Sequence, residues 1–208
     1  MAPHTQQDSR TKLLDAALRV IRAKGYAATT VDDICRQAGV TKGSFFHHFK
    51  SKDELALAAA RHFSTMADGL FATAPYNDAP DPLDRLLGYV DFRAAILGDE
   101  LPEYTCLLGT LVQETYATHP EIRAACDEGM SAHIAELMRD IDAAKKRHVP
   151  EAAWTVESVG YFIQSVLQGA FIFAKAKQSP DVIRDSLAHL RRYLELLFTP
   201  PRKPKEKT

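Results

Sequence analysis

The chain has 208 residues, of which 46% are hydrophobic and 25% are charged, a composition typical of a folded globular protein. No apolar run approaches the roughly 20 residues that span a bilayer, and the start "MAPHTQQDSRTK" lacks the apolar core of a secretory signal, so we expect a cytoplasmic protein without a membrane partner. Three widely spaced cysteines with no CxxC pair argue against a disulfide framework or a zinc knuckle.

Charge is unevenly distributed along the chain. Residues 1–55 hold nine Lys/Arg against six Asp/Glu, a net charge of +3, and the remainder holds 17 against 21, a net charge of −4. A basic N-terminal part on a nearly neutral protein predicts a local anionic partner. The basic segment 201–208 follows Pro200 and Pro201, and we expect it to be a disordered tail.

Apolar residues recur at helical spacing along the chain, and no segment shows the alternation of a strand. The segment "ATAPYNDAPDP" (72–82) is rich in Pro, Asp and Asn and is the clearest linker. The sequence therefore predicts an all-α protein of about nine helices. The longer helices are expected at residues 9–24, 51–72, 82–97, 104–118, 121–147, 151–177 and 181–198.

Two short helices are predicted between the first and second of these longer ones. Thr30 caps the first, with Asp33 three residues later as a weak variant of the capping box, and Gly39 ends it. Thr41 caps the second short helix. Ser51 then opens a long helix with a complete Ser-x-x-Glu capping box.

The short pair joined by "AGVT" resembles a helix-turn-helix, in which the first residues of the second helix approach base edges in the major groove. Lys42 can meet a phosphate or a guanine, the hydroxyls of Thr41 and Ser44 can bond phosphates or bases, and Gly43 lets the backbone approach closely. Helix N-termini also attract phosphate. The predicted DNA contacts are Thr30, Thr41, Lys42, Gly43, Ser44, Phe46, His47 and Lys52.

Other kinds of site have little support in the sequence. His47 and His48 are adjacent on a helix and point about 100° apart, so they are poorly placed to share a metal ion. The chain has no HExxH, no P-loop and no GxSxG motif. We therefore expect no metal, no cofactor and no enzymatic activity. The alternative is an all-α enzyme or metal-binding protein without a recognisable motif, and a protein-binding adaptor would not need Lys42 beside a helix N-cap.

The segment "LLDAALRVIRAKGYAATTVDDICRQAGVTKGSFFHHFKSKDELALAA" resembles the DNA-binding domain of TetR-family transcriptional regulators. The resemblance implies an all-helical homodimer whose first three helices bind double-stranded operator DNA. It also implies a ligand-responsive regulator, most often a repressor, whose larger part binds a small-molecule effector and dimerises through its last two helices. The expected domains are 1–52 and 53–200. The family often has tyrosine where this chain has Phe46, and that hydroxyl usually donates to phosphate.

The segment "TCLLGTLVQETYATHPEIRAAC" resembles a TetR subgroup that includes electrophile-responsive regulators, and the resemblance points to Cys106 as a thiol sensor. Cys35 and Cys126 lie on apolar helix faces and are expected in the core, and His133 shares the stripe of Cys126 and is expected to pack there. An effector cavity should be mostly apolar. Its predicted residues are Phe63, Met66, Tyr89, Phe92, Cys106, Gln113 and Tyr161.

The last two predicted helices suggest an interface between two copies of the chain. The helix at 151–177 is apolar nearly all round, and the helix at 181–198 carries an apolar stripe, so together they could form half of a four-helix dimer bundle. The alternative is a core within one chain. The predicted interface residues are Phe162, Val166, Gly169, Phe173, Leu187, Leu190 and Leu194.

Overall fold

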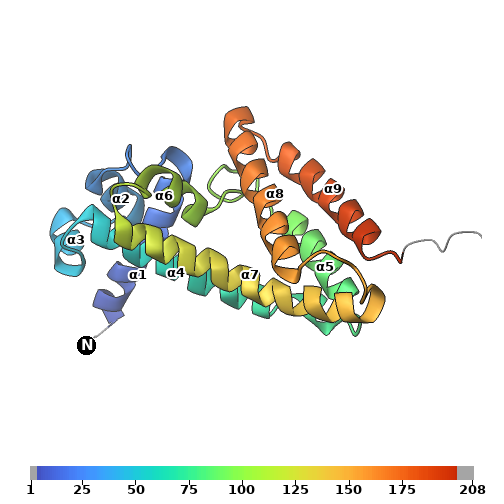
Figure 1. The fold of residues 1–208 in the computed structure, drawn as a ribbon. Helices are drawn as coiled ribbons and strands as arrows, with labels where there is room; N and C mark the ends of the chain where they lie inside the picture. Colours follow the sequence, from blue (N-terminus) through green and yellow to red (C-terminus); the bar gives the residue numbers. More distant parts are fainter. Residues whose placement is uncertain (1–3, 201–208) are drawn as a thin grey trace, which may run out of the picture.

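The computed structural model describes residues 4–200, with side chains from residue 9 onward, and the predicted tail 201–208 lies outside the described residues. Residues 4–200 form nine α-helices, one short 3-10 helix and no strand, which confirms the predicted all-α class. Figure 1 shows an elongated molecule in which α4 and α7 run lengthwise, with α2 and α3 at one end and α5 and α9 at the other. The elements are α1 (His4–Lys24), α2 (Val31–Ala38), α3 (Lys42–His48), α4 (Lys52–Ala72), η1 (Pro75–Asp78), α5 (Pro82–Ala95), α6 (Leu107–Thr115), α7 (Pro120–His148), α8 (Val156–Lys177) and α9 (Asp181–Leu197).

Side-chain caps fix where the N-terminal helices begin. The Thr30 hydroxyl accepts a hydrogen bond from the amide of Asp33 at 3.2 Å, and the Asp33 carboxylate accepts one from the amide of Thr30 at 3.0 Å. This is a complete capping box, although the sequence indicated only a weak variant. At Ser51 the hydroxyl accepts from the amide of Glu54 as predicted, but the longer Glu54 side chain reaches back to the amide of Lys50 at 2.7 Å.

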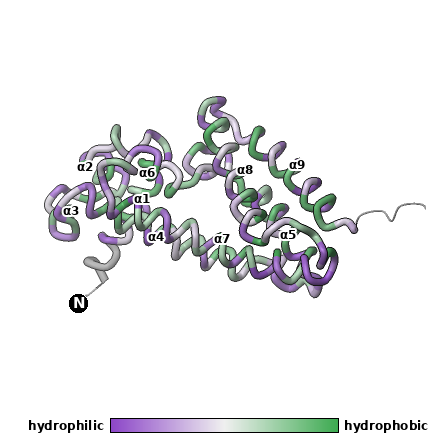
Figure 2. The backbone as a smooth tube through the Cα atoms, viewed as in Figure 1, coloured by the Kyte–Doolittle hydropathy of each residue, from purple (hydrophilic) through white to green (hydrophobic). Residues whose placement is uncertain are grey.

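The first of two hydrophobic cores joins α1–α4 to α6 and the first half of α7. Phe45 and Phe49 anchor α3 in this core, with 0% and 2% of their surface exposed, and Cys35 and Cys126 are buried there as predicted. Figure 2 shows hydrophobic and hydrophilic segments alternating along these helices, as expected for helices that bury one face. The expected domain boundary after residue 52 therefore falls inside a packed core and not at a linker.

The second hydrophobic core joins α5, the second half of α7, α8 and α9. The apolar stripe of α9 faces inward here, so Leu187, Leu190 and Leu194 are buried within the chain itself. Cys106 packs against both cores. The two cores thus meet beside the start of α6.

Several helix boundaries and the expected linker differ from the sequence-based expectation. The helix α8 begins at Val156, not at 151, because the Thr155 hydroxyl caps it by accepting from the amide of Ser158 at 3.1 Å. The helix α6 spans only Leu107–Thr115, with Cys106 as its N-cap. The expected linker at 72–82 contains the 3-10 helix η1. Across residues 4–200, no helix combines the length and the apolar character required to cross a membrane.

Candidate nucleic-acid interface and effector pocket

The start of α3 presents a polar, open backbone surface. The Thr41 hydroxyl accepts from the amide of Ser44 at 3.2 Å and so caps the helix. A side chain added at Gly43 would meet only the Thr41 hydroxyl oxygen, at 3.7 Å, so the backbone there is accessible to a large partner. Phe46 is 57% exposed, and His47 is exposed beside it. These residues lie on one solvent-facing end of the molecule, as predicted for a DNA-binding helix.

Lys42 is exposed and already has an ionic partner within the chain. Its Nζ lies 2.8 Å from a carboxylate oxygen of Asp32 on α2. This hydrogen bond to Asp32 raises the pKa of Lys42, so the side chain is a cation at neutral pH. Both side chains are more than half exposed, so water and salt weaken the pair, and a phosphate can replace the carboxylate.

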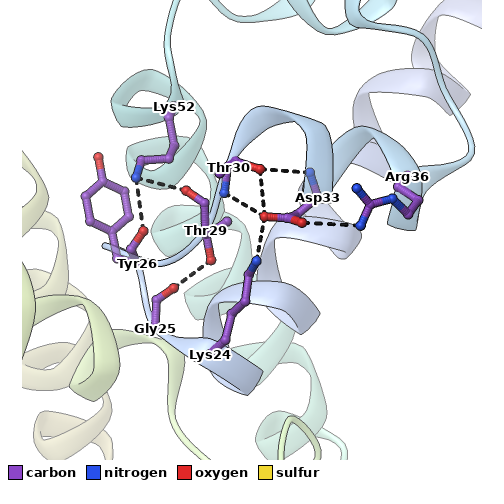
Figure 3. A network of polar contacts seen from close by, with 8 residues as sticks. All are labelled: Lys24, Gly25, Tyr26, Thr29, Thr30, Asp33, Arg36 and Lys52. Carbon is purple, nitrogen blue, oxygen red and sulfur yellow. Dashed lines mark hydrogen bonds and ion pairs between the residues drawn. The ribbon is translucent and has the colours of Figure 1, made fainter.

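Lys52 occupies a different place from the one expected. Its Nζ donates to the backbone oxygens of Tyr26 and Thr29, both at 3.0 Å, and lies 4.1 Å from the centroid of the Tyr26 ring. Figure 3 shows the ammonium directed into the loop between α1 and α2. We predicted a contact with a backbone phosphate, whereas the structure uses the donors of Lys52 to hold this loop.

Asp33 is the centre of a second set of contacts in the same loop (Figure 3). Its carboxylate accepts from Lys24 at 2.5 Å, from Arg36 at 3.3 Å and from both the amide and the hydroxyl of Thr30. The hydrogen bond from Lys24, followed by those from Thr30, holds the pKa of Asp33 well below its usual range. The Thr30 hydroxyl, predicted to contact DNA, therefore takes part in an intramolecular network.

The α1–α2 loop is also tied to the larger part of the chain. The Glu114 carboxylate of α6 accepts from the amide of Ala27 at 2.8 Å. The Tyr26 hydroxyl donates to Asp53 on α4. Gly25 has a φ of +88°, a conformation that favours glycine, and a Cβ there would lie 2.4 Å from the Glu114 carboxylate, which would have to move. The loop is thus a joint between the N-terminal helices and α6.

A pocket of about 420 Å³ lies where the two cores meet. Its walls come from α1, α4, α5, α6, α7, α8 and α9 and from the segment between α5 and α6. Of the predicted pocket residues, Phe63, Met66 and Cys106 line it. The volume lies within the range of about 300–1,000 Å³ that is usual for small-molecule sites.

The other four predicted pocket residues do not line this cavity. Tyr89 lies behind the wall, with its hydroxyl hydrogen-bonded to His133 and Gln164, which do line it. Phe92 is half-buried and packs on the wall residue Phe71, with ring centroids 5.8 Å apart. The Gln113 amide donates to the Gly109 oxygen within α6. Tyr161 is 49% exposed on the outer surface of α8 because the turn of that helix points it away from both cores.

Several polar pocket residues were not predicted from the sequence. Arg22, Arg93, His133 and Gln164 all line the cavity. His133 was expected to pack in the core because it shares a stripe with Cys126, and that stripe extends into the pocket wall. Arg22 and Arg93 lie on amphipathic helices that carry other charged residues, and periodicity does not distinguish a helix face in a pocket from a face exposed to solvent.

Cys106 lies at a helix N-terminus and close to two cations. It is the N-cap of α6, and its sulfur accepts from the amide of Gly109 at 3.4 Å. The half-buried cations Arg22 and Lys175 interact electrostatically with it. Burial lowers the pKa of Arg22 to about 10 and also lowers the pKa of Lys175. Lys175 also donates to the Thr110 hydroxyl at 2.5 Å.

The outer surface of α8 and α9 is unusually apolar. Phe162 and Phe173 are 41% and 60% exposed, Val166 is half-buried, and a side chain added at Gly169 would meet no atom within 4 Å. Three further exposed apolar residues were not predicted: Ile172, Tyr193 and Leu196. The prediction for Leu187, Leu190 and Leu194 was wrong, because the stripe they form on α9 faces the chain's own core.

No group of three or more His, Cys, Asp or Glu side chains in the described part of the chain is arranged to hold a metal ion. His47 and His48 lie with ring centroids 4.9 Å apart in a nearly perpendicular arrangement. The polar groups of interest are therefore those at the start of α3 and those in the pocket.

Comparisons with known proteins agree with this geometry. Residues 13–59 match the family described as bacterial regulatory proteins, tetR family. Residues 82–189 match the C-terminal domain described as transcriptional regulator LmrA/YxaF-like. The transcriptional regulator AcuR of Cereibacter sphaeroides is 30% identical over 175 residues, which cover 81% of this chain and 77% of AcuR. The transcriptional repressor NemR of Escherichia coli is 24% identical over 192 residues, which cover 92% of this chain and 96% of NemR.

Solved structures share the fold. The reduced form of E. coli NemR superposes with a TM-score of 0.72 at 22% identity, over 88% of this chain and 96% of that one. A TetR-family regulator from Agrobacterium tumefaciens superposes with a TM-score of 0.79 at 21% identity, over 92% of this chain and 98% of that one. The chain therefore belongs to the TetR family of bacterial transcriptional regulators.

Proposed function

We propose that this TetR-family regulator is a cytoplasmic repressor that a small apolar or electrophilic effector releases from a pseudo-palindromic operator. The observation that carries the proposal is the path between the pocket and the DNA-binding helices. One end of α6 begins at Cys106 in the pocket wall, and near its other end Glu114 bonds the loop that precedes α2.

The DNA end of the proposal rests on the start of α3. Lys42 supplies a positive charge, Thr41 and Ser44 supply hydroxyl groups, and Gly43 leaves the backbone open. These groups suit phosphate and base contacts in a major groove. We keep Thr41, Lys42, Gly43, Ser44, Phe46 and His47 as proposed DNA contacts and assign Thr30 and Lys52 to positioning the loop.

Two copies of the chain are needed to read a pseudo-palindrome. The exposed apolar side chains on α8 and α9 give a face that a second copy would cover, since Phe162 and Tyr193 already stack there with ring centroids 4.8 Å apart. The two α3 helices of such a homodimer would enter successive major grooves about 34 Å apart or a multiple of that distance. Pairing through α8 and α9 leaves the α3 ends free.

The effector acts in this proposal through α6. A nine-residue helix behaves as a short rigid rod, so a shift at Cys106 moves Glu114 as well. Glu114 holds the amide of Ala27, and the same loop holds Lys52 and Asp53 of α4. The bound effector favours a second arrangement of the two α3 helices, by an amount equal to its difference in affinity for the two arrangements.

Cys106 is the proposed point of attack for an electrophilic effector. A thiol becomes more reactive at a helix N-terminus and beside cations, and Cys106 has the start of α6, Arg22 and Lys175 around it. Alkylation would remove the sulfur from its hydrogen bond with Gly109 and place added bulk in the pocket wall. That change disturbs the first turn of α6.

The test is selection of bound DNA from a random pool, followed by release measurements on the selected sequence. We expect enrichment of a pseudo-palindrome, and release when the protein is treated with N-ethylmaleimide. Cys106→Ala should keep operator binding but resist release, whereas the buried Cys126→Ala serves as the matched control and should still be released. Failure to enrich any sequence would contradict operator binding, and equal release of the Cys106 variant would contradict the role of this thiol.

A further inference from the structure

The acidic and basic side chains in the pocket wall differ in how many of their polar atoms have hydrogen-bond or ion-pair partners. Two arginines and two carboxylates line the cavity. Glu103 accepts from the amide of Glu100 at 3.3 Å and lies 3.8 Å from Arg19, and Asp68 is exposed to solvent. The two carboxylates therefore have protein partners or are hydrated. The two arginines have different surroundings.

Arg93 is held by aromatic rings and not by a carboxylate. Its guanidinium carbon lies 5.1 Å from the ring centroid of Phe71 and 5.9 Å from those of Tyr89 and Phe171. Among the described residues, no ion pair or hydrogen bond uses its N–H groups. Ring faces attract the cation, but a guanidinium has five N–H donors that rings satisfy poorly. Arg93 thus brings a positive charge and unused donors to a half-buried position in the wall.

The polar groups beside Arg93 are neutral. Burial, with a smaller contribution from the charge of Arg93, lowers the pKa of His133 to about 4. Burial also raises the pKa of Tyr89, so its phenol keeps its proton. The Gln164 amide donates to the Tyr89 oxygen at 3.2 Å, and that phenol lies 2.9 Å from Nε2 of His133. Arg93 is therefore the charged member of this group at neutral pH.

Arg22 repeats the pattern at another part of the same wall. Its Nε is buried without a hydrogen-bond partner, and its guanidinium carbon lies 5.7 Å from the ring centroid of Phe63. A buried, unpartnered donor is unfavourable unless a ligand or water satisfies it. The pocket thus combines apolar side chains with two cations that form no ion pair with a carboxylate among the described residues.

We propose that the effector is an organic carboxylate with an apolar body, and that its carboxylate binds Arg93. A carboxylate can accept two parallel N–H bonds from a guanidinium, which supplies the acceptors that Arg93 lacks. The apolar body would lie against Phe71, Phe171 and Leu167 and extend towards Phe63. This inference rests on the proposed function, because it names the chemical class of ligand for the same pocket.

The experiment compares acids with their uncharged analogues by calorimetry on the full-length protein. The probes are butyrate, octanoate and 4-phenylbutyrate, each paired with its primary amide, which matches the acid in size but carries no charge. We expect at least one acid to bind the wild-type protein about tenfold or more tightly than its amide. Equal affinity for acid and amide in all three pairs overturns the proposal.

Variants of the pocket arginines then show which of them binds the carboxylate of the ligand. Arg93→Gln should remove the preference for the acid and leave the affinity for the amide unchanged, while Arg93→Lys should keep part of the preference because the charge remains. Arg139→Gln, on an exposed surface pair with Glu136, is the control and should keep all of it. Loss of the preference in Arg22→Gln but not in Arg93→Gln overturns the assignment to Arg93.

Operator binding by the same proteins is measured separately by fluorescence anisotropy. It separates the two proposals, because the acid preference is read without DNA. If wild-type protein binds no selected DNA but still prefers the acid, the proposed function fails and the ligand class stands. If the wild-type protein binds selected DNA but shows no preference for the acid, the proposed ligand class fails and operator binding stands. An unchanged melting temperature of the ligand-free Arg93→Gln protein confirms that this variant is folded.

Discussion

The N-terminal helices and the pocket hold their cations in opposite ways. In the N-terminal part, Lys24 and Lys42 pair with carboxylates of α2, and Lys52 donates to two backbone oxygens. In the pocket, Arg22 and Arg93 lie against aromatic rings and form no ion pair with a carboxylate in the described part of the chain. A partner binding to the first region must displace contacts that already exist, whereas a ligand in the second supplies contacts that are missing.

The paired cations of the N-terminal part maintain the local structure, whereas the cations of the pocket are available to bind a ligand. The internal pairs of the N-terminal part set the geometry of the α1–α2 loop before any DNA arrives, so little ordering is left for the binding step. The buried Nε of Arg22 is costly in the unliganded protein, because this donor lacks a partner. Binding free energy at the pocket can therefore be large for a ligand of suitable charge, and it is available to shift the arrangement of the two α3 helices.

The largest expected effect concerns Lys52. Lys52→Ala removes two charge-assisted hydrogen bonds and a cation–π contact, so we expect the free energy of unfolding to fall by about 3 kcal/mol. Urea denaturation measures this, with Lys50→Ala, an exposed neighbour, as the control that should change little. If Lys52→Ala has unchanged stability but binds the operator more weakly, then Lys52 contacts a DNA phosphate as first expected. The contrast between the cations of the N-terminal helices and those of the pocket would then fail for Lys52.

The second prediction concerns the pH dependence of stability. The folded protein lowers the pKa of His133 from 6.5 to about 4, so between these values the unfolded chain binds a proton that the folded chain does not. This contribution makes the protein less stable as pH falls from 6.5 towards 4. In His133→Gln the loss of stability between pH 7 and 4.5 should be about 2 kcal/mol smaller than in wild type. Urea denaturation at both pH values checks this, and exposed His189→Gln should behave as wild type.

A third, smaller effect tests whether DNA replaces the carboxylate partner of Lys42. Lys42→Ala should weaken operator binding about tenfold and reduce the salt slope by about 1, as for the loss of one phosphate contact. Asp32→Asn frees the same lysine and removes a negative charge, so it should tighten binding about two- to threefold. Anisotropy titrations over a range of salt concentrations measure both. A salt slope in Lys42→Ala equal to that of wild type rules out the contact.

The smallest expected effect concerns Phe46, which is exposed beside the start of α3. Phe46→Tyr adds a hydroxyl that can donate to a phosphate, and one such bond is worth about 1 kcal/mol, or about fivefold in affinity. Gel-shift titration on the selected operator measures this, with Phe46→Leu as a control that adds no donor. Identical affinities for Phe46→Tyr and wild type would show that this position does not face a phosphate.

Features that depend on near neighbours in the sequence could be predicted, and features assembled from distant helices could not. The caps at Thr30, Thr41 and Ser51 and the buried anchors Phe45 and Phe49 follow from spacing of a few residues. The pocket brings together side chains from eight parts of the chain, so only three of its seven predicted residues line it. Periodicity identifies an apolar stripe but not which neighbour covers it.

The stripe of α9 makes the same point, since Leu187, Leu190 and Leu194 are as suitable for a dimer bundle as for the internal core that buries them. The sequence pattern does not show that Phe173 and Leu196 stay on the surface of the folded chain, whereas their exposed fractions in the structure do. Arg22 and Arg93 lie on amphipathic helices, and only the folded arrangement shows that they face a cavity and that the Nε of Arg22 is buried without a partner.

The loop joint has a consequence for building hybrid regulators. Exchanging the DNA-binding segment alone, with the junction after residue 52, would graft a foreign α1–α2 loop onto the native Glu114 and Asp53. Glu114 fits closely against Gly25, so a donor sequence with another residue there would strain the backbone and displace the Glu114 carboxylate. A transplantable unit therefore consists of two separate stretches, the N-terminal helices and the end of α6, and specificity swaps should exchange both together.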